Sequence, residues 1–118
     1  MSVATFADRL ARVRHRFVST LESKIDDAYA SIAGLADGAP AAPQSIAATY
    51  RAIHGVAGVG PTVGFPSTGH AARAVEEVLR EAQQRERGLT ADEILLYKKH
   101  LHALREAASR ELEFFYSF

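Results

Sequence analysis

The sequence predicts an all-α fold, an antiparallel four-helix bundle with up-down-up-down topology. In four segments the apolar residues recur at every third or fourth position, which is the spacing of an amphipathic helix. Short segments rich in glycine and proline separate the four, and short connections favour antiparallel neighbours. No segment shows the alternation of apolar and polar residues that is typical of a strand.

The first helix is predicted to run from Phe6 to about Ala36, where the segment DGAPAAP ends it because proline cannot continue a helix. Its predicted inward-facing residues are Phe6, Leu10, Val13, Phe17, Leu21, Ile25, Ala28, Ile32 and Leu35. The second helix begins near Gln44 and is weakened by Gly58, Gly60 and Pro61. Its inner stripe consists of Ile46, Thr49, Ile53 and Val56.

A turn over the segment VGFPS precedes a third helix, for which Ser67 is the predicted N-cap. Gly88 ends this helix, and its inward-facing residues are Thr68, Ala72, Val75, Leu79 and Ala82. Thr90 and Glu93 have the spacing of a capping box, so a fourth helix is predicted to start there. Its inward-facing residues are Ile94, Tyr97, Leu101, Leu104, Ala108, Leu112 and Phe115.

The composition is that of one globular domain spanning residues 1–118. Lys plus Arg and Asp plus Glu each number 14, so the chain has no excess of positive charge with which to bind nucleic acid. The sequence has no cysteine, which excludes thiol catalysis and thiolate metal sites. Because no segment has the character of a signal peptide or a membrane span, we expect a cytoplasmic protein with no membrane partner. We also expect a monomer without a cofactor.

His54 is the residue best suited to chemistry. On a helical wheel it lies roughly 125° from the centre of the inner stripe of the second helix, so its ring should face solvent. An exposed imidazole is mostly neutral at cytoplasmic pH and keeps a lone pair on one ring nitrogen, which can accept a phosphoryl group. The alternative is that His54 is an ordinary surface residue.

The residues around His54 are unusual for the end of a helix. Because helical side chains lean toward the N-terminus, Ala57 and Gly58 should lie over His54, with Tyr50 and Arg51 beneath it. An interior glycine costs about 1 kcal/mol relative to alanine, so helix stability does not explain Gly58. Either Gly58 clears the approach of a phosphorylated partner to the ring, or the glycines of this segment let two helices pack closely or simply end the second helix.

The segment from Tyr50 to Leu79 resembles the signature of histidine phosphotransfer (HPt) domains. That signature is a histidine, a lysine three residues later followed by glycine, and a second glycine six residues further on with an aromatic residue or leucine beside it. A helix with small and apolar positions follows and ends in an acidic residue. The matching residues in this chain are His54, Gly58, Gly64, Phe65, Ala72 and Glu76.

The resemblance implies a phosphocarrier that holds a phosphoryl group on His54, not an enzyme with its own ATP site. The sequence agrees in having no glycine-rich loop of the Walker type. The implied partners are the receiver domain of a response regulator, a sensor histidine kinase, or both. A likeness to the phosphotransfer domain of chemotaxis kinases implies that Glu76 bonds the proximal imidazole nitrogen and leaves the distal one nucleophilic. The alternative for Glu76 is a surface ion pair with Arg73 or Arg80.

The chain departs from the HPt signature at Ala57, which stands where the family usually has its lysine. A phosphoryl group on His54 would lack that cation, and Arg51 or Arg73 is the expected replacement. If neither arginine acts in this way, the chain is a weakened module that binds receivers without efficient transfer.

Two other classes of function compete with phosphotransfer. A metal or haem bundle is suggested by the five histidines, but no Glu-x-x-His pair and no haem-attachment motif occurs. The four histidines other than His54 are therefore expected to be surface or boundary residues, namely His15, His70, His100 and His102. The stronger alternative is a pure interaction module whose docking surface contains Tyr50, His54 and Gly58.

Overall fold

The computed structural model describes residues 5–117, and these residues form an all-helical protein. The helices are α1 (Phe6–Ala30), α2 (Ile32–Leu35), α3 (Ala42–Val59), α4 (Pro66–Gln84) and α5 (Ala91–Tyr116), with a 3-10 turn, η1 (Pro61–Val63), between α3 and α4. The only extended pairing in the described residues is an isolated bridge between Ala36 and Leu89. The predicted all-α class is confirmed.

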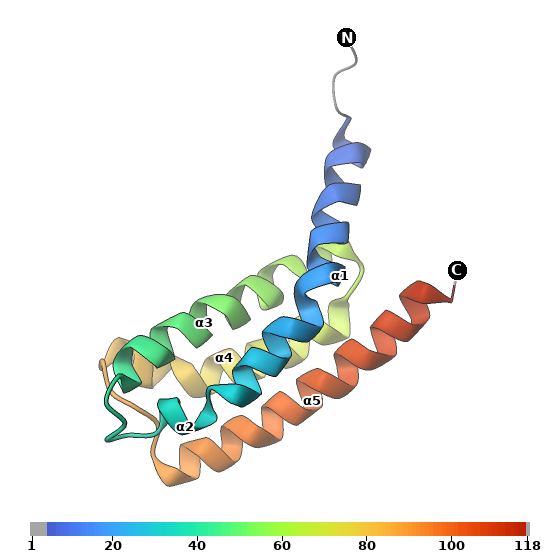
Figure 1. Cartoon of the computed structure of the whole chain (residues 1–118). Coiled ribbons are helices and arrows are strands. Elements are labelled where there is room, and N and C mark those ends of the chain that lie inside the picture. Colours follow the sequence, from blue (N-terminus) through green and yellow to red (C-terminus); the bar gives the residue numbers. More distant parts are fainter. Residues whose placement is uncertain (1–4, 118) are drawn as a thin grey trace.

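The four long helices enclose one apolar core (Figure 1). The most extensive packing joins α3 to α4 and α4 to α5, while α1 lies across α3 and α5. The inner stripes predicted for the second and third helices are confirmed, because every residue of both is buried. The N-terminal turns of α1 extend beyond the rest of the molecule (Figure 1).

The first helix is shorter than predicted, since α1 ends at Ala30 and the short helix α2 follows. At the break, the Ser31 hydroxyl donates a hydrogen bond of 2.7 Å to the carbonyl oxygen of Asp27. A serine that bonds the backbone in this way competes with the regular helical pattern. The inward-facing assignment was also wrong at the start of the helix, where Phe6 and Val13 are exposed.

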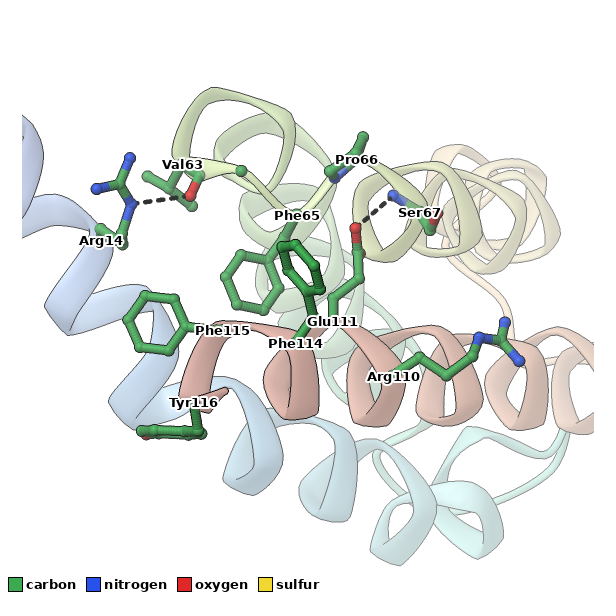
Figure 2. Close-up of a pocket in the computed structure, with 11 residues that line it drawn as sticks. Arg14, Val63, Phe65, Pro66, Ser67, Arg110, Glu111, Phe114, Phe115 and Tyr116 are labelled. Atoms are coloured by element: carbon green, nitrogen blue, oxygen red, sulfur yellow. Dashed lines mark hydrogen bonds between the residues drawn. The ribbon is translucent and has the colours of Figure 1, made fainter. Parts of the chain in front are cut away.

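The second helix starts at Ala42, two residues earlier than predicted, because Pro43 is accommodated in its first turn. The prediction of Ser67 as an N-cap is wrong, since α4 begins at Pro66 and Ser67 is already helical. The cap comes from α5 instead (Figure 2). Glu111 accepts a hydrogen bond of 3.2 Å from the Ser67 amide. It also accepts from the Thr68 amide at 2.6 Å and from the Thr68 hydroxyl at 2.7 Å.

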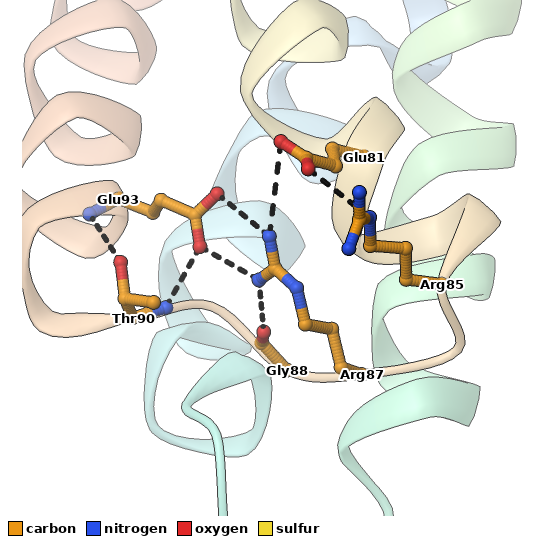
Figure 3. A network of polar contacts seen from close by, with 6 residues as sticks. All are labelled: Glu81, Arg85, Arg87, Gly88, Thr90 and Glu93. Atoms are coloured by element: carbon orange, nitrogen blue, oxygen red, sulfur yellow. Dashed lines mark hydrogen bonds and ion pairs between the residues drawn. The ribbon is translucent and has the colours of Figure 1, made fainter.

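The start of α5 follows the prediction, because Thr90 and Glu93 form the capping box. Arg87 braces the connection from α4, donating to Glu93 at 2.8 Å and to the Gly88 carbonyl at 2.8 Å (Figure 3). This hydrogen bond from Arg87 lowers the pKa of the Glu93 carboxyl below its usual value. Gly88 is required here, since a Cβ would lie 2.6 Å from the backbone of Asp37.

The inner stripe predicted for the fourth helix is buried from Tyr97 to Leu112, with Ile94 partly buried. The assignment of Phe115 as inward-facing was wrong, since that side chain is exposed near the end of α5. The core ends one turn earlier than the apolar pattern of the sequence does.

Candidate functional site

His54 lies on α3, with 65% of its side chain exposed. Its Nδ1 atom is 3.0 Å from Oε1 of Glu76, which projects from the neighbouring helix α4. A carboxylate can only accept a hydrogen bond, so Nδ1 carries the proton of the neutral ring and donates a hydrogen bond to Glu76. The lone pair of the neutral imidazole is then on Nε2, which is the distal nitrogen.

Glu76 is almost fully buried, and three donors meet at its Oε1 atom. Besides His54, the Tyr50 hydroxyl donates at 3.3 Å and the Arg80 guanidinium at 3.4 Å. Burial raises the pKa of this carboxyl, but the hydrogen bond and charge of His54, with the bonds from Tyr50 and Arg80, outweigh burial and leave the pKa below its usual value. Glu76 is therefore an anion beside the imidazole at neutral pH.

Tyr50 also restrains the imidazole from one side. It lies one helical turn before His54, and the two rings are nearly parallel, with centroids 5.9 Å apart and planes inclined by 11°. The ring of His54 is thus held by stacking from its own helix and by a hydrogen bond from the next helix. Such restraint keeps the ring nitrogens of His54 in one orientation.

The two arginines that were expected to replace the family lysine do not join the contacts around Glu76. Arg51 and Arg73 are exposed, and neither forms a hydrogen bond or ion pair with any part of the chain that the structure describes. Arg80 is the guanidinium that contacts the site, and the sequence reasoning considered it only as a surface partner of Glu76. Its position four residues after Glu76 was the available signal. Arg80 also pairs with Glu77 at 2.7 Å.

Ala57, which was expected to lie over His54, is not part of the exposed surface. It is 2% exposed and belongs to the core. The reason is its helical phase, since Ala57 lies roughly 60° from the centre of the inner stripe and packs inward with that stripe. The side chain of a lysine at this position would therefore leave the backbone inside the core, and not at the exposed surface beside His54.

The glycines near His54 differ in what their surroundings require. A Cβ on Gly60 would lie 2.9 Å from the Val56 carbonyl, so this residue permits close packing. Gly58 is exposed, and a Cβ there would contact nothing in the described residues. Packing therefore does not explain Gly58. Gly64 is exposed in a left-handed conformation with φ of 94°, and it turns the chain so that Phe65 enters the core.

The remaining histidines do not assemble into a metal site. His15, His70 and His102 are exposed, and His100 is half-buried. Among residues 5–117, no three side chains of His, Cys, Asp or Glu come close enough together to hold a metal ion. None of the helices in this range combines the length and apolar character needed to cross a bilayer.

Comparisons with protein-family models, with curated proteins and with solved structures found no match to this chain. The indications of function are therefore the geometry at His54 and the resemblance of residues 50–79 to the HPt signature.

Proposed function

We propose that this chain is a histidine phosphotransfer domain, a four-helix bundle of up-down-up-down topology that relays a phosphoryl group through His54. Its partners are the aspartate-bearing receiver domains of response regulators, a sensor histidine kinase, or both. The observation that carries the proposal is the 3.0 Å contact between His54 Nδ1 and buried Glu76, on a ring that is otherwise exposed. It is a phosphocarrier and not an enzyme that binds ATP itself.

The proposed reaction uses Nε2 of His54 as the nucleophile. Its lone pair attacks the phosphorus of an aspartyl phosphate, an N–P bond forms, and the acyl phosphate P–O bond breaks. The electron pair of that bond leaves with the receiver's aspartate as a carboxylate. Positive charge develops on the imidazole during the attack, and the Glu76 carboxylate stabilises it through Nδ1. Transfer to a second receiver reverses these steps.

The approach to Nε2 depends on the surface around His54. The open space over Gly58 lets a partner's phosphorylated carboxylate come into line with the nitrogen. Tyr50 supports the ring by stacking, and its hydroxyl helps to hold Glu76 in place. These contacts prepare the nucleophile before the partner arrives.

A second candidate is a module that binds receivers without efficient transfer. It is favoured by the burial of Ala57 and by the lack of contacts from Arg51 and Arg73 in residues 5–117, because no side chain then neutralises a phosphoryl group on Nε2. The two candidates differ in whether a phosphorylated receiver labels the chain.

The test uses receivers carrying a labelled aspartyl phosphate. Label should pass to the wild-type chain and to the control His70→Ala, which removes an exposed histidine from α4. It should not pass to His54→Ala, which circular dichroism should show to be folded because the ring is exposed. The labelled product should be stable in base and labile in acid, as expected of a phosphoramidate.

Two outcomes would contradict phosphotransfer. Label that persists in His54→Ala would move the acceptor to another residue. A receiver that binds the chain measurably but never labels it would support the module that only binds. Binding is measured separately by titration calorimetry, so the two candidates can be distinguished.

A further inference from the structure

The N-terminal part of α1, residues 6–16, extends beyond the apolar core (Figure 1). We call this segment the arm. Further along α1, Phe17 and Leu21 are buried, but on the arm Phe6 is 73% exposed and Val13 is 44% exposed. The arm therefore leaves large apolar side chains open to solvent.

The apolar residues of the arm share one broad face of the helix. On a helical wheel they occupy a sector of roughly 160°, in which Arg14 is the one charged residue. The residues of this sector are Phe6, Ala7, Leu10, Ala11 and Val13. A helix that packs against a single partner helix needs only a narrow apolar seam, so this face is suited to a wider apolar surface.

Three arginines lie along one edge of this apolar face. Arg9, Arg12 and Arg16 fall within roughly 60° of the wheel and are exposed. None of the three forms an ion pair with a residue in the range 5–117. The one acidic residue of the arm, Asp8, accepts a hydrogen bond of 3.1 Å from the Thr5 amide in the capping box of α1. With four arginines and one aspartate, the arm is positively charged.

The end of α5 adds aromatic side chains next to the arm (Figure 2). Phe115 and Tyr116 line a hollow together with Ala11 and Arg14 of the arm. The two rings meet nearly edge to face, with centroids 5.2 Å apart, and Tyr116 is 70% exposed. Arg14 fixes the base of the arm to the body, because its Nε atom donates a hydrogen bond of 3.0 Å to the Val63 carbonyl. The arm and the end of α5 thus form one surface.

We propose that the surface formed by the arm and the end of α5 binds an anionic lipid membrane. The apolar face of the arm enters the boundary between headgroups and acyl chains, as basic amphipathic helices do. Arg9, Arg12 and Arg16 contact lipid phosphates along the edge of that face. Arg14 buries its aliphatic stem and keeps its guanidinium at the level of the headgroups, where tyrosines such as Tyr116 are enriched. This attachment differs from the absence of a membrane partner expected from the sequence.

A second copy of the chain is a poorer occupant of the arm. Two arms packed against each other would bring their arginines together. A groove lies between the end of α5 and the start of α4, and the charged residues that line it are Arg14, Arg110 and Glu111. Glu111 already accepts hydrogen bonds from the first turn of α4, so the groove offers a basic arm no free acidic partner. Glu113 on α5 is exposed, but it is outnumbered by the four arginines of the arm.

Other partners match only part of the surface. A nucleic acid would contact the arginines but leave the apolar face in water. An acidic partner helix would cover only a narrow seam of that face. An anionic membrane covers the broad apolar face and the arginines at once, because the acyl chains and the phosphates lie in adjacent layers.

The test measures binding of the whole chain to lipid vesicles by flotation. Wild type should bind vesicles of phosphatidylserine and phosphatidylcholine in equal parts at low salt. Vesicles of phosphatidylcholine alone should bind it about ten-fold more weakly or less, because they lack the negative surface potential. Binding to the anionic vesicles should also weaken as salt is added, since salt screens exposed charges.

Substitutions on the arm separate the charged from the apolar contribution. Arg12→Gln should weaken binding to the anionic vesicles about five-fold, and the double variant that adds Arg9→Gln about 30-fold. Phe6→Ser should weaken it about ten-fold, because less apolar surface leaves water. The three side chains are exposed, so the circular dichroism spectrum should not change.

The matched controls are Lys98→Gln and Leu95→Ser, near the start of α5 and thus at the end of that helix away from the arm (Figure 1). Lys98 is an exposed cation, and Leu95 is an apolar residue with 65% exposure. Both controls should bind the anionic vesicles as wild type does.

Equal binding to anionic and neutral vesicles would overturn the proposal, as would arm variants that bind as the controls do. No binding to either kind of vesicle, with a dimer in sedimentation equilibrium that Phe6→Ser abolishes, would assign the arm to a second copy instead. None of these variants changes a residue that forms a hydrogen bond or ring contact with His54. Labelling by a phosphorylated receiver should therefore stay at the wild-type level in all of them, so vesicle binding and phosphotransfer can fail independently.

Discussion

Replacing Glu76 with glutamine should keep the fold and slow transfer to His54 roughly ten-fold. Oε1 of Glu76 accepts from His54, Tyr50 and Arg80 at 3.0, 3.3 and 3.4 Å. A glutamine carbonyl oxygen can accept the same hydrogen bond from Nδ1, so the ring should keep its orientation. The amide lacks the negative charge that opposes the positive charge developing on the ring as Nε2 attacks.

The magnitude follows from the kind of hydrogen bond that is lost. A hydrogen bond to a charged group contributes about 1.5–3 kcal/mol, and one between neutral groups about 0.5–1.5 kcal/mol. If the difference of about 1–1.5 kcal/mol is expressed in the transition state, the rate falls by roughly ten-fold.

The assay is a single-turnover, rapid-quench measurement with a labelled phosphorylated receiver. The matched control is Glu77→Gln, because Glu77 is an exposed neighbour that pairs with Arg80 and does not contact His54. Wild-type rates are expected for this control. An unchanged rate in Glu76→Gln would refute the role of the carboxylate, and equal slowing in both variants would assign the effect to Arg80.

The same pair of proteins gives a test that needs no partner. The folded-state pKa of Glu76 lies below the usual carboxyl value of 4.5, despite burial, because of the donors around it. The stabilising contribution of the charged carboxylate is therefore complete above pH 4.5 and is lost as the pH falls through the folded-state pKa. The excess stability of wild type over Glu76→Gln should disappear in acid, as measured by urea unfolding.

Four further substitutions separate structural from functional roles. Glu111→Ala should lower the free energy of unfolding by about 2–3 kcal/mol in urea, because it leaves the buried Thr68 amide and hydroxyl without their acceptor. Ala57→Lys should cost about 1–3 kcal/mol of stability by the same measurement, since the side chain would start in the core, and wild-type stability would contradict this. Gly55→Ala and Gly58→Ala should each stabilise α3 by about 1 kcal/mol, whereas only Gly58→Ala should slow phosphotransfer if that position clears the partner's approach.

Much of the fold could be predicted from the sequence because the helices are amphipathic and each inner stripe keeps a regular period. The capping box at Thr90 is local in sequence, and it was predictable for the same reason. The cap of α4 was not, because Glu111 reaches it from 44 residues away along the chain. Periodicity also could not show where the core ends, so Phe6 and Phe115 were wrongly placed inside.

The candidate site was predictable only in part. The helical wheel predicts that His54 faces solvent, and the resemblance to HPt domains pointed to Glu76 as the partner of Nδ1. The convergence of Tyr50 and Arg80 on the same oxygen depends on how α3 and α4 pack, which no local pattern encodes. The burial of Ala57 has the same origin, since α4 covers the side of α3 on which that residue lies.

The position of the cation has a consequence for the proposed relay. Arg80 meets Glu76 on the Nδ1 side of the ring, whereas a phosphoryl group would be attached at Nε2. In the proposed relay, Arg80 therefore stabilises the carboxylate that would activate His54, without neutralising the phosphoryl group after transfer. The described part of the chain would thus give a phosphoryl group on Nε2 little electrostatic stabilisation. The phosphoryl group should therefore pass readily to a receiver that offers cations around its aspartate. Label followed to equilibrium should lie mainly on such a receiver, and accumulation on His54 would mean that a cation, Arg51 or Arg73, moves to Nε2 once the phosphoryl group is bound.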